Sequence, residues 1–589
     1  MNRIPIRVDV AVTLAAPFHV GGGKGGAGAC SYLLRDGAGL PYWPGSAFKG
    51  KVRHYARLLY EGAAGQCGFE HSKEEGKEDS GRVKPCECMV CALLGGAGNA
   101  RGSLLFGDMR LTAASKHTEL RAGNAIDRCR RTAKDDHLFQ TETAAADVLV
   151  GEITGTLAEA DFDRQKELLE ASIRAIPHIG GGTGRGLGWV KDIAVSIIAE
   201  PKADQAPSTN GDFPFVTLPV RLTAQSPLLI GTRTSESNFR ATLRHIPGAV
   251  LRAALAQALV AQDGGGDETS KVNWVTPEGG KGRFPSLRKD FGELRITQFL
   301  PCDHKHVEAC RFGGCRFAPM TAKHLKYGDD RDKSFDTLFC DSQGDKRTER
   351  VKGFIHPCGT LANPIQTMVV TKSAMNRFSG TSQDEMLFST EVIPPPAVFE
   401  GFLSGQFDPA ELARLTENGI RVGGYQTAGY GRCRVEVLSP VNTADTREQL
   451  RGRIVRCGEK IPVTLRSDAI VTLTEPADLT DVGYLRAYQE ALFAELTGVT
   501  LTKAVARHGQ WRGFDTSKRT KEILEQQTLH VIQAGAVFLL EATGLTDELL
   551  DRLLALQANG ICREDIHNRN GYGQIRVADE YHFLREEMG

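Results

Sequence analysis

Alternating apolar and polar residues predict the first strand of the chain. Residues 7–14 read Arg-Val-Asp-Val-Ala-Val-Thr-Leu, a period of two that is typical of a half-buried β-strand. A Pro-Gly turn followed by a capping serine at 44–46 predicts a helix that continues to Leu59. The same kind of pattern predicts strands near 104–111 and 147–157, a helix over 161–175 and a last strand over 189–198.

This order of elements recurs along the chain. A second copy starts at Leu218 and ends near Val437, and a third starts at Ile461. Each copy closes on a helix, a glycine-rich turn and a short strand, with the turn and strand at 180–190, 423–435 and 568–577. A repeat of this length indicates one architectural unit used about three times. Since the order is strand, helix, strand, strand, helix, strand, we predict an α+β protein of tandem ferredoxin-like (βαββαβ, RRM-like) units with long insertions.

Breaker-rich and polar stretches divide the chain. Residues 204–213 are polar and contain several turn formers, which indicates a linker. The predicted units are 1–203, 214–450 and 451–589. The third copy lacks the Pro-Gly helix start and is the most divergent. Polar insertions near 65–85 and 262–286 are long enough to be functional or mobile loops.

Charge and hydropathy exclude some broad classes. The 72 basic residues balance the 72 acidic ones, so a nucleic-acid site must be a local basic groove. No apolar run approaches the roughly 18 residues that a membrane helix needs, and the chain enters a strand directly after Met1. We therefore expect a cytoplasmic protein with no membrane partner. The 14 cysteines are too sparse for a disulfide scaffold, so clustered cysteines are better explained as metal ligands.

The glycine-rich turns are candidate phosphate-binding loops. Backbone without side chains can approach a phosphate closely and offer its N–H groups. Arg185, Arg432 and Arg569 place a cation in or beside each turn. These loops lead from helix to strand, whereas a dinucleotide fingerprint leads from strand to helix. For a single glycine, a tight reversal that needs a positive φ is an equally good explanation; three arginine-bearing copies favour phosphate contact.

Three motifs resemble the RAMP superfamily of CRISPR-associated proteins. They are the Pro-Gly-Ser-x-x-Lys-Gly-x-x-Arg helix start at 44–53, the Ile-Asp-Arg segment at 126–128 ahead of Leu138-Phe139, and the repeated helix, glycine turn and strand. Residues 1 to about 200 resemble the repeating backbone subunit of type III effector complexes. Residues from about 214 to 589 resemble the double-RAMP subunit that caps the crRNA 5′ handle.

The resemblance implies a scaffold that holds guide RNA (crRNA) and displays its bases to a complementary target RNA, in an antiviral complex with other type III CRISPR effector subunits. A subunit that only assembles the complex, without touching RNA, is the plainest rival. Taken singly, each charged candidate is more simply a solvated surface group. The positions expected to contact RNA are Lys49, Lys51, Arg53, Arg128, Arg130, Arg131, Gly184, Arg185, Gly186, Arg252, Arg377, Gly429, Arg432 and Arg569.

The rival activity is that of an endoribonuclease that cleaves target RNA or processes pre-crRNA. Catalytic relatives use an aspartate in the loop after the first strand, and Cys30 stands at that position, so the resemblance argues against cleavage. The weak catalytic candidates are Asp36, Glu236 and His54. Asp36 is more simply a turn residue before Gly37, and His54 more simply a structural histidine.

Cysteine clusters in the two insertions are candidate structural zinc sites. Zinc takes four thiolate or imidazole ligands, commonly from a Cys-x-x-Cys pair and a second pair some 20 residues away. Free cysteines are the alternative. The first insertion offers five candidates for four places, which are Cys67, His71, Cys86, Cys88 and Cys91. The second has no pair of ordinary spacing, and its candidates are Cys302, Cys310, Cys315, Cys340 and Cys358, with His304 and His306 nearby.

Overall fold

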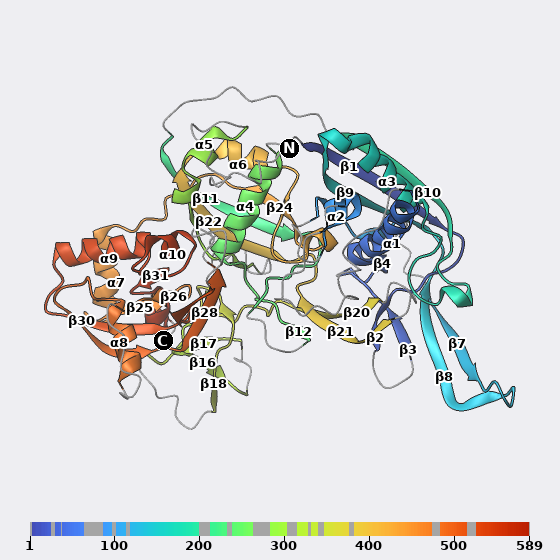
Figure 1. Ribbon diagram of the computed structural model, residues 1–589. Coiled ribbons are helices and arrows are strands. Elements are labelled where there is room, and N and C mark those ends of the chain that lie inside the picture. Colours follow the sequence, from blue (N-terminus) through green and yellow to red (C-terminus); the bar gives the residue numbers. More distant parts are fainter. Residues whose placement is uncertain are drawn as a thin grey trace, which may run out of the picture.

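The chain folds into a mixed α+β structure with three principal antiparallel sheets, each packed against helices (Figure 1). Among the described residues, no helix is both long and apolar enough to cross a bilayer. Most of the predicted linker, 204–212, and most of both polar insertions lie outside the described residues. The computed structural model describes residues 3–24, 30–36, 38–63, 86, 88–96, 102–112, 118–199, 213–232, 238–262, 283–302, 315–327, 332–339, 347–375, 382–473, 483–514 and 526–587.

The first sheet has the strand order β10-β1-β9-β6-β4, and β5 also pairs with β9. Strand β1 buries alternate apolar residues against helices α1 and α3, as its period-two pattern predicts. The elements are β1 (Arg3–Leu14), β4 (Tyr42–Trp43), α1 (Gly45–Ala63), α2 (Met89–Leu94), β5 (Leu104–Phe106), β6 (Met109–Leu111), β9 (Val148–Ala158), α3 (Phe162–Arg174) and β10 (Val190–Ala199).

One detail of the first sheet differs from the prediction. The single strand expected over 104–111 is interrupted at Gly107 and Asp108, which separates β5 from β6. The reason is local hydrogen bonding, because Gly107 N–H donates to Glu152 O at 2.8 Å and the Asp108 carboxylate accepts from Gly45 N–H at 2.8 Å. The strand break therefore holds the first turn of α1.

The second sheet repeats this arrangement with the order β13-β22-β11-β24-β23, and β14 also pairs with β22. Its core includes Leu218, Val220 and Leu222 of β11, all buried. The elements are β11 (Phe215–Ala224), α4 (Gly248–Gln262), α5 (Pro285–Lys289), β13 (Arg295–Ile296), β14 (Leu300–Pro301), β22 (Val398–Gln406), α6 (Pro409–Thr416), β23 (Ile420–Arg421) and β24 (Arg432–Val437).

The third sheet has the order β27-β30-β25-β31. In all three sheets the last strand pairs with the first, the first with the third, and the third with the second or its two halves. This recurrence agrees with the repeat seen in the sequence. The elements are α7 (Arg447–Arg456), β25 (Ile461–Leu465), α8 (Tyr484–Ala491), β27 (Val499–Val505), β30 (Val537–Ala542), α9 (Asp547–Asn559), α10 (Asp565–Arg569) and β31 (Ile575–Val577).

Two long hairpins accompany the first two sheets. The Leu-Phe-x-Thr-Glu segments lie at matching places, with Ser31 paired to Thr141 and Arg240 paired to Thr390 in parallel register. The hairpin β7–β8 projects beyond the rest of the molecule (Figure 1). The elements are β2 (Gly21–Lys24), β3 (Cys30–Leu33), β7 (Thr118–Ile126), β8 (Ala133–Ala144), β12 (Phe239–Arg240), β20 (Met368–Met375) and β21 (Ser382–Val392).

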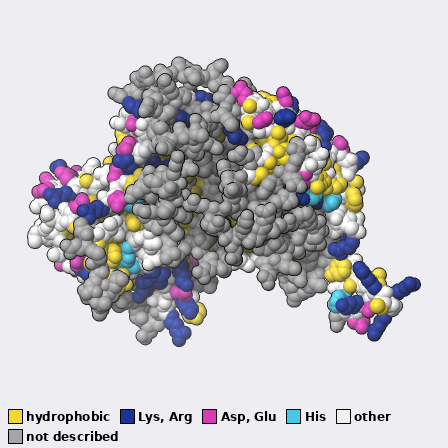
Figure 2. Space-filling view, viewed as in Figure 1, with side chains coloured by type: hydrophobic (Ala, Val, Ile, Leu, Met, Phe, Trp, Pro, Cys, Tyr) yellow, Lys and Arg dark blue, Asp and Glu magenta, His cyan; other side chains and the backbone are white. Residues whose placement is uncertain are grey.

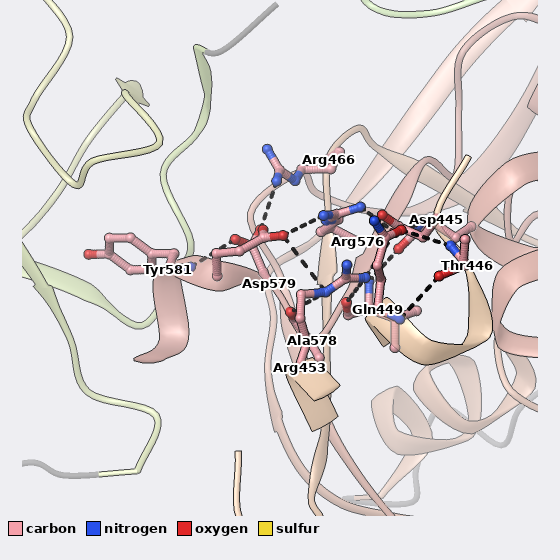
Figure 3. Close-up of polar contacts among 12 residues, drawn as sticks. Asp445, Thr446, Gln449, Arg453, Arg466, Arg576, Ala578, Asp579 and Tyr581 are labelled. Carbon is pink, nitrogen blue, oxygen red and sulfur yellow. Dashed lines mark hydrogen bonds and ion pairs between the residues drawn. The ribbon is translucent and has the colours of Figure 1, made fainter. Parts of the chain in front are cut away.

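A buried ion-pair cluster links separate segments of the second half of the chain. Arg316, from the segment that follows the second insertion, pairs with the fully buried Asp579, and Arg466 Nη2 lies 2.9 Å from the other carboxylate oxygen. Burial alone would raise the pKa of Asp579, but these two arginines hold it well below its ordinary value. Beside it, Arg453 and Arg576 both pair with Asp445 (Figure 3).

The remaining strands form small sheets beside the second and third ones. The segment from Arg316 to Ile355 is tied to the third sheet because Met320 N–H donates to Gly535 O and Lys503 Nζ donates to Leu338 O. These strands are β15 (Arg316–Phe317), β16 (Ala322–Leu325), β17 (Ser334–Asp336), β18 (Thr348–Arg350), β19 (Phe354–Ile355), β26 (Ala469–Val471), β28 (His508–Phe514) and β29 (Gln526–Ile532).

Candidate nucleic-acid interface

The three glycine-rich turns end in the same backbone conformation, although the third is longer and contains α10. Each is closed by a hydrogen bond from the residue that enters the turn to its last glycine, in the pairs Ile179–Gly188, Val422–Gly431 and Ile561–Gly573. The glycines adopt the positive φ that residues with a Cβ rarely tolerate. The values are 82° and 68° at Gly186 and Gly188, 98° and 86° at Gly429 and Gly431, and 81° and 65° at Gly571 and Gly573.

This register corrects the sequence-based comparison of the arginines. Since Gly186 matches Gly429, Arg185 stands opposite Ala428, and Arg432 stands opposite Trp189. The arginines beside the turns are therefore not equivalent to one another. Their roles have to be argued one by one from the contacts that each makes.

The second turn packs against the first sheet. A Cβ added at Gly429 would lie 2.9 Å from Phe106 O and 3.3 Å from Gly45 Cα, so no side chain fits there. Arg432 pairs with Glu152 of the first sheet. The first sheet and α1 therefore cover this turn, and the Arg432 guanidinium contributes to the contact between the two sheets.

The third turn packs against the second sheet in the same way. Gln298 Nε2 donates to Gly571 O at 2.9 Å, and Arg252 Nε donates to Asn570 Oδ1 at 2.7 Å. Arg252 also donates to the carbonyl of Phe291, and burial lowers its pKa to about 10. Arg569 pairs with Glu293 and Asp565.

The cations of helix α1 are also engaged within the protein. Arg53 Nη2 donates to Leu94 O at 2.7 Å and to Gly95 O, which satisfies carbonyls at the end of α2. Lys51 Nζ lies 3.0 Å from His178 Nε2, and burial lowers the pKa of both groups. Lys49 is half-buried on the same helix.

The first turn, in contrast, is open. A Cβ added at Gly184 or Gly186 would meet nothing within 4 Å. The Arg185 guanidinium lies over the Phe139 ring, 5.0 Å from its centroid, about midway along the β7–β8 hairpin, where Phe139 pairs with Gly123. Trp189 is 46 % exposed and stands edge-on to His178. We call Lys51, Phe139, His178, Arg185 and Trp189 the turn surface; cations and aromatic rings are the groups that hold phosphates and stack on bases.

The tip of the β7–β8 hairpin carries a second group of cations. Arg128, Arg130 and Arg131 are exposed there, and Figure 2 shows Lys and Arg side chains gathered at the end of the hairpin. The Asp127 carboxylate orders the tip, because its Oδ1 accepts from the N–H groups of residues 129 and 130 at 2.8 and 2.9 Å. We call Arg128, Arg130, Arg131 and Lys134 the hairpin tip.

Exposed apolar side chains lie along the strands of the hairpin. Ile126 and Leu138 are each 64 % exposed, and Leu120 is 60 % exposed. Cations beside exposed apolar groups suit single-stranded nucleic acid, which offers both phosphates and base faces.

Comparison with known proteins agrees with this geometry. Residues 12–191 match the RAMP superfamily model. This RAMP region contains α1, α3 and the strands β4, β5, β6 and β9 of the first sheet, together with the hairpin and the first turn. The match agrees with the superfamily that the motifs of this region resemble. A search of curated proteins finds no match for the chain.

The catalytic candidates of the RAMP region lie in structural surroundings. Asp36 Oδ1 accepts from the N–H groups of Ala38 and Leu40 at 2.9 and 3.0 Å, and its Oδ2 lies 2.5 Å from Arg110 Nη1. Such contacts are typical of an aspartate that stabilises a turn. His54 is exposed on α1 and stands edge-on to Tyr55, and burial together with Arg57 and Lys51 lowers its pKa. Glu236 and Arg377, and the side chain of Cys30, lie outside the described residues.

The RAMP region also contains a candidate metal centre. The sulfurs of Cys86, Cys88 and Cys91 lie within 4.8 Å of one another, so these residues could hold a metal ion. Cys88 caps α2, where its sulfur accepts from Cys91 N–H at 3.4 Å. Cys67 and His71, the other candidates, lie outside the described residues.

Among the described residues, the second candidate site brings no three ligand atoms as close together as the first site does. Burial raises the pKa of Cys302 to about 12, and Glu400 adds to this effect. Cys315 is buried with its sulfur 3.5 Å from His356 Nδ1, while Cys358 is exposed. His356 was not a candidate from the sequence, because it lies 41 residues from Cys315 with no cysteine pair to mark it. Cys310, Cys340, His304 and His306 lie outside the described residues.

The sequence also missed parts of the nucleic-acid candidate. The sequence predicts Phe139 and Trp189 only as residues of strands, and it gives no reason to choose Lys134 as an RNA contact. Only the folded hairpin and turn place these side chains beside the arginines. Exposed aromatic residues in an otherwise alternating strand are the one signal that could have drawn attention to them.

Proposed function

We propose that the chain is a crRNA-binding scaffold subunit of a cytoplasmic type III CRISPR effector complex. In this proposal it consists of three tandem ferredoxin-like units, 1–203, 214–450 and 451–589, and holds the guide RNA backbone and its 5′ handle for pairing with target RNA. The observation that carries the proposal is the exposed basic hairpin tip beside the open turn surface, both within the RAMP region.

The physical argument rests on which cations remain accessible. Guanidinium groups bind phosphate oxygens in a bidentate manner and stack on bases. The hairpin tip presents three exposed arginines, and Arg185 lies against an aromatic ring about midway along the hairpin. Arg53 instead stabilises the first unit, and Arg252, Arg432 and Arg569 stabilise the contacts between units.

A structural zinc ion is part of the same proposal. Zn–S bonds of about 2.3 Å place tetrahedral sulfurs about 3.8 Å apart, a spacing that the Cys86, Cys88 and Cys91 cluster fits. Cys67 or His71 would complete the four ligands. When bound, the ion would supply the folding energy that a polar insertion lacks.

The deciding experiment measures crRNA affinity against salt concentration. Replacing Arg128, Arg130 and Arg131 together with alanine should weaken binding and reduce the slope of log K against log salt by about 2, since each lost contact to single-stranded RNA contributes about 0.7. Arg164→Ala, which removes an exposed arginine on α3, is the matched control. An unchanged slope in the triple variant would remove the hairpin tip from the RNA interface.

Cleavage of RNA is not proposed. The Asp36 carboxylate is taken up by two backbone amides and Arg110, and His54 has an aromatic neighbour rather than an acid or base partner among the contacts described. An endoribonuclease would nevertheless be revealed if purified protein with crRNA cut a complementary target. The Asp36→Asn and His54→Ala variants would then identify its catalyst.

A further inference from the structure

Two contacts between consecutive sheets use the same construction. In each, the glycine turn of the later sheet packs on a helix-start glycine and a strand break of the earlier sheet. We call this pair of features the receiving site. The first receiving site consists of Gly45 with residues 106–108, and the second of Gly248 with residues 296–298.

The fit at each receiving site depends on the absence of side chains. A Cβ at Gly429 would lie 2.9 Å from Phe106 O, and one at Gly571 would lie 2.5 Å from Ile296 O. On the receiving side, a Cβ at Gly248 would lie 2.6 Å from Asn570 O. Backbone meets backbone, so both partners need glycine.

The third sheet offers no receiving site of this kind in its described residues. Helix α8 follows Gly483 without a Pro-Gly start, and β27 runs as one strand with a bulge between Leu501 and Lys503. Its edge is also covered, since Lys503 Nζ donates to Leu338 O at 3.0 Å. The series of contacts therefore stops at the third sheet.

The opposite end of the series is open. Gly186 has the conformation of Gly429 and Gly571, with φ of 82°, but a Cβ there would meet nothing within 4 Å. The first turn is thus a docking element for which the described residues offer no counterpart.

We infer that the first turn docks on the receiving site of a separate protein that carries a Pro-Gly helix start followed by an interrupted edge strand. A second copy does not fit as the partner, because both receiving sites found in the described residues are already occupied by the chain's own turns. The protein would therefore terminate an assembly of such subunits rather than polymerise with itself, which is a heterologous contact that does not propagate in one direction.

The internal contacts also indicate what surrounds the partner's receiving site. At the strand break stands a residue with a polar side-chain oxygen, Asp108 in one case and Gln298 in the other. The hairpin strand β20 lies beside β2, which pairs with β3 in the sheet of the first hairpin, and Lys372 donates to Ser46 Oγ at 3.2 Å. By the same geometry, the β7–β8 hairpin would reach across the partner's surface. The inference extends the proposed function to assembly, but it would hold even if RNA binding failed.

The test uses full-length protein and, as the probe, a purified single-unit protein of the same superfamily with a free Pro-Gly helix start. Gly186→Asn keeps a residue that tolerates positive φ but adds a side chain at the contact. We expect it to weaken association by about tenfold or more, as for a side chain forced into a packed interface centre. Gly458→Asn is the matched control, because Gly458 has φ of 68° and equally open surroundings in the second half of the chain.

Three further readouts decide the outcome. Wild-type protein alone should remain monomeric as its concentration rises, and self-association that Gly186→Asn abolishes would overturn the exclusion of a second copy. Replacing the probe's own helix-start glycine with glutamine should weaken association too, which makes the result independent of how well Gly186→Asn folds. Equal probe binding by wild type and both blocked variants would overturn the inference. Measuring probe association in the absence of crRNA keeps the result separate from the proposed RNA-binding role.

Discussion

The first and second glycine turns have the same backbone but different surroundings. Both are closed by the same hydrogen bond, and both have positive φ at the same two positions. Gly186 faces open space, whereas Gly429 lies against Phe106 and Gly45. The side chains at one matching position differ accordingly, because Trp189 is exposed, whereas its counterpart Arg432 pairs with Glu152 of the first sheet. Glycine positions therefore set the conformation of the turn, and the neighbouring part of the molecule sets what its side chains do.

The largest effect is expected where the two turns are alike. A Cβ at Gly188 would lie 2.0 Å from Ile179 O, and one at Gly431 would lie 2.2 Å from Val422 O. Alanine at either position combines an unfavourable φ with a backbone clash, so we expect each to destabilise its unit by about 3 kcal/mol or more. Thermal unfolding measures this.

Gly39→Ala is the matched control for that experiment. Gly39 has φ of 78° with nothing near its Cβ position, so alanine there adds only the conformational cost of about 1 kcal/mol. If Gly188→Ala or Gly431→Ala cost no more than Gly39→Ala, the close backbone approach inside the turns would be disproved.

The next effect separates the two turns. Gly186→Ala and Gly429→Ala impose the same strain on φ, but only the second adds a clash with the preceding sheet. We expect Gly429→Ala to lower the unfolding free energy by about 1–2 kcal/mol more than Gly186→Ala. Equal losses would show that the second turn does not pack on the first sheet in solution.

The segments around α2 and α5 can be compared in the same way, and we expect only the first to depend on a bound metal ion. Arg53 donates to carbonyls after α2, which Cys88 caps, and Arg252 donates to carbonyls after α5. The first of these segments contains the cysteine cluster, while Phe284 and Phe291 fill the second. We expect a chelator, or Cys91→Ser, to remove bound zinc and to expose the residues around α2 to hydrogen exchange, leaving α5 protected. Metal analysis and exchange mass spectrometry measure both. Full α2 protection after complete metal loss would contradict a structural ion.

The sequence predicted the helices, strands and turns of the repeated units better than it predicted the contacts between the units. Alternation located β1 and β11, the Pro-Gly starts located α1 and α4, and glycine spacing located all three turns, because each of these signals is local. The break at Gly107 and Asp108 was missed, since a strand pattern continues through it.

Contacts between units were beyond sequence reasoning for a physical reason. Arg252 and Arg432 have the residue type and motif position of an RNA ligand, yet Arg252 is satisfied by a turn more than 300 residues away and Arg432 by Glu152. Only long-range packing decides whether a guanidinium is used inside the protein or left at the surface. The hairpin tip kept its exposed arginines because the chain forms no second layer over it in the described residues.

The smallest expected effect concerns a buried ammonium group at the closed turn. Lys372 lies 4.6 Å from the centroid of the Tyr430 ring, and burial lowers its pKa from 10.5 to about 8. The unfolded chain therefore binds more protons than the folded one between those two values, so this group makes stability rise with pH across that window. Lys372→Met keeps the length of the side chain and removes the charge.

We therefore expect the stability of the wild type relative to Lys372→Met to increase between about pH 7.5 and about pH 9.5. The raised pKa values of Tyr42 and Tyr430 act in the opposite direction only at higher pH, and their effect is common to both proteins. Lys191→Met, which removes an exposed lysine on β10, provides the control difference. Urea unfolding at the two pH values measures these free energies. A pH-independent difference between wild type and Lys372→Met would mean that the ammonium group stays hydrated, and that the second turn is less tightly closed against the first sheet than its glycine contacts imply.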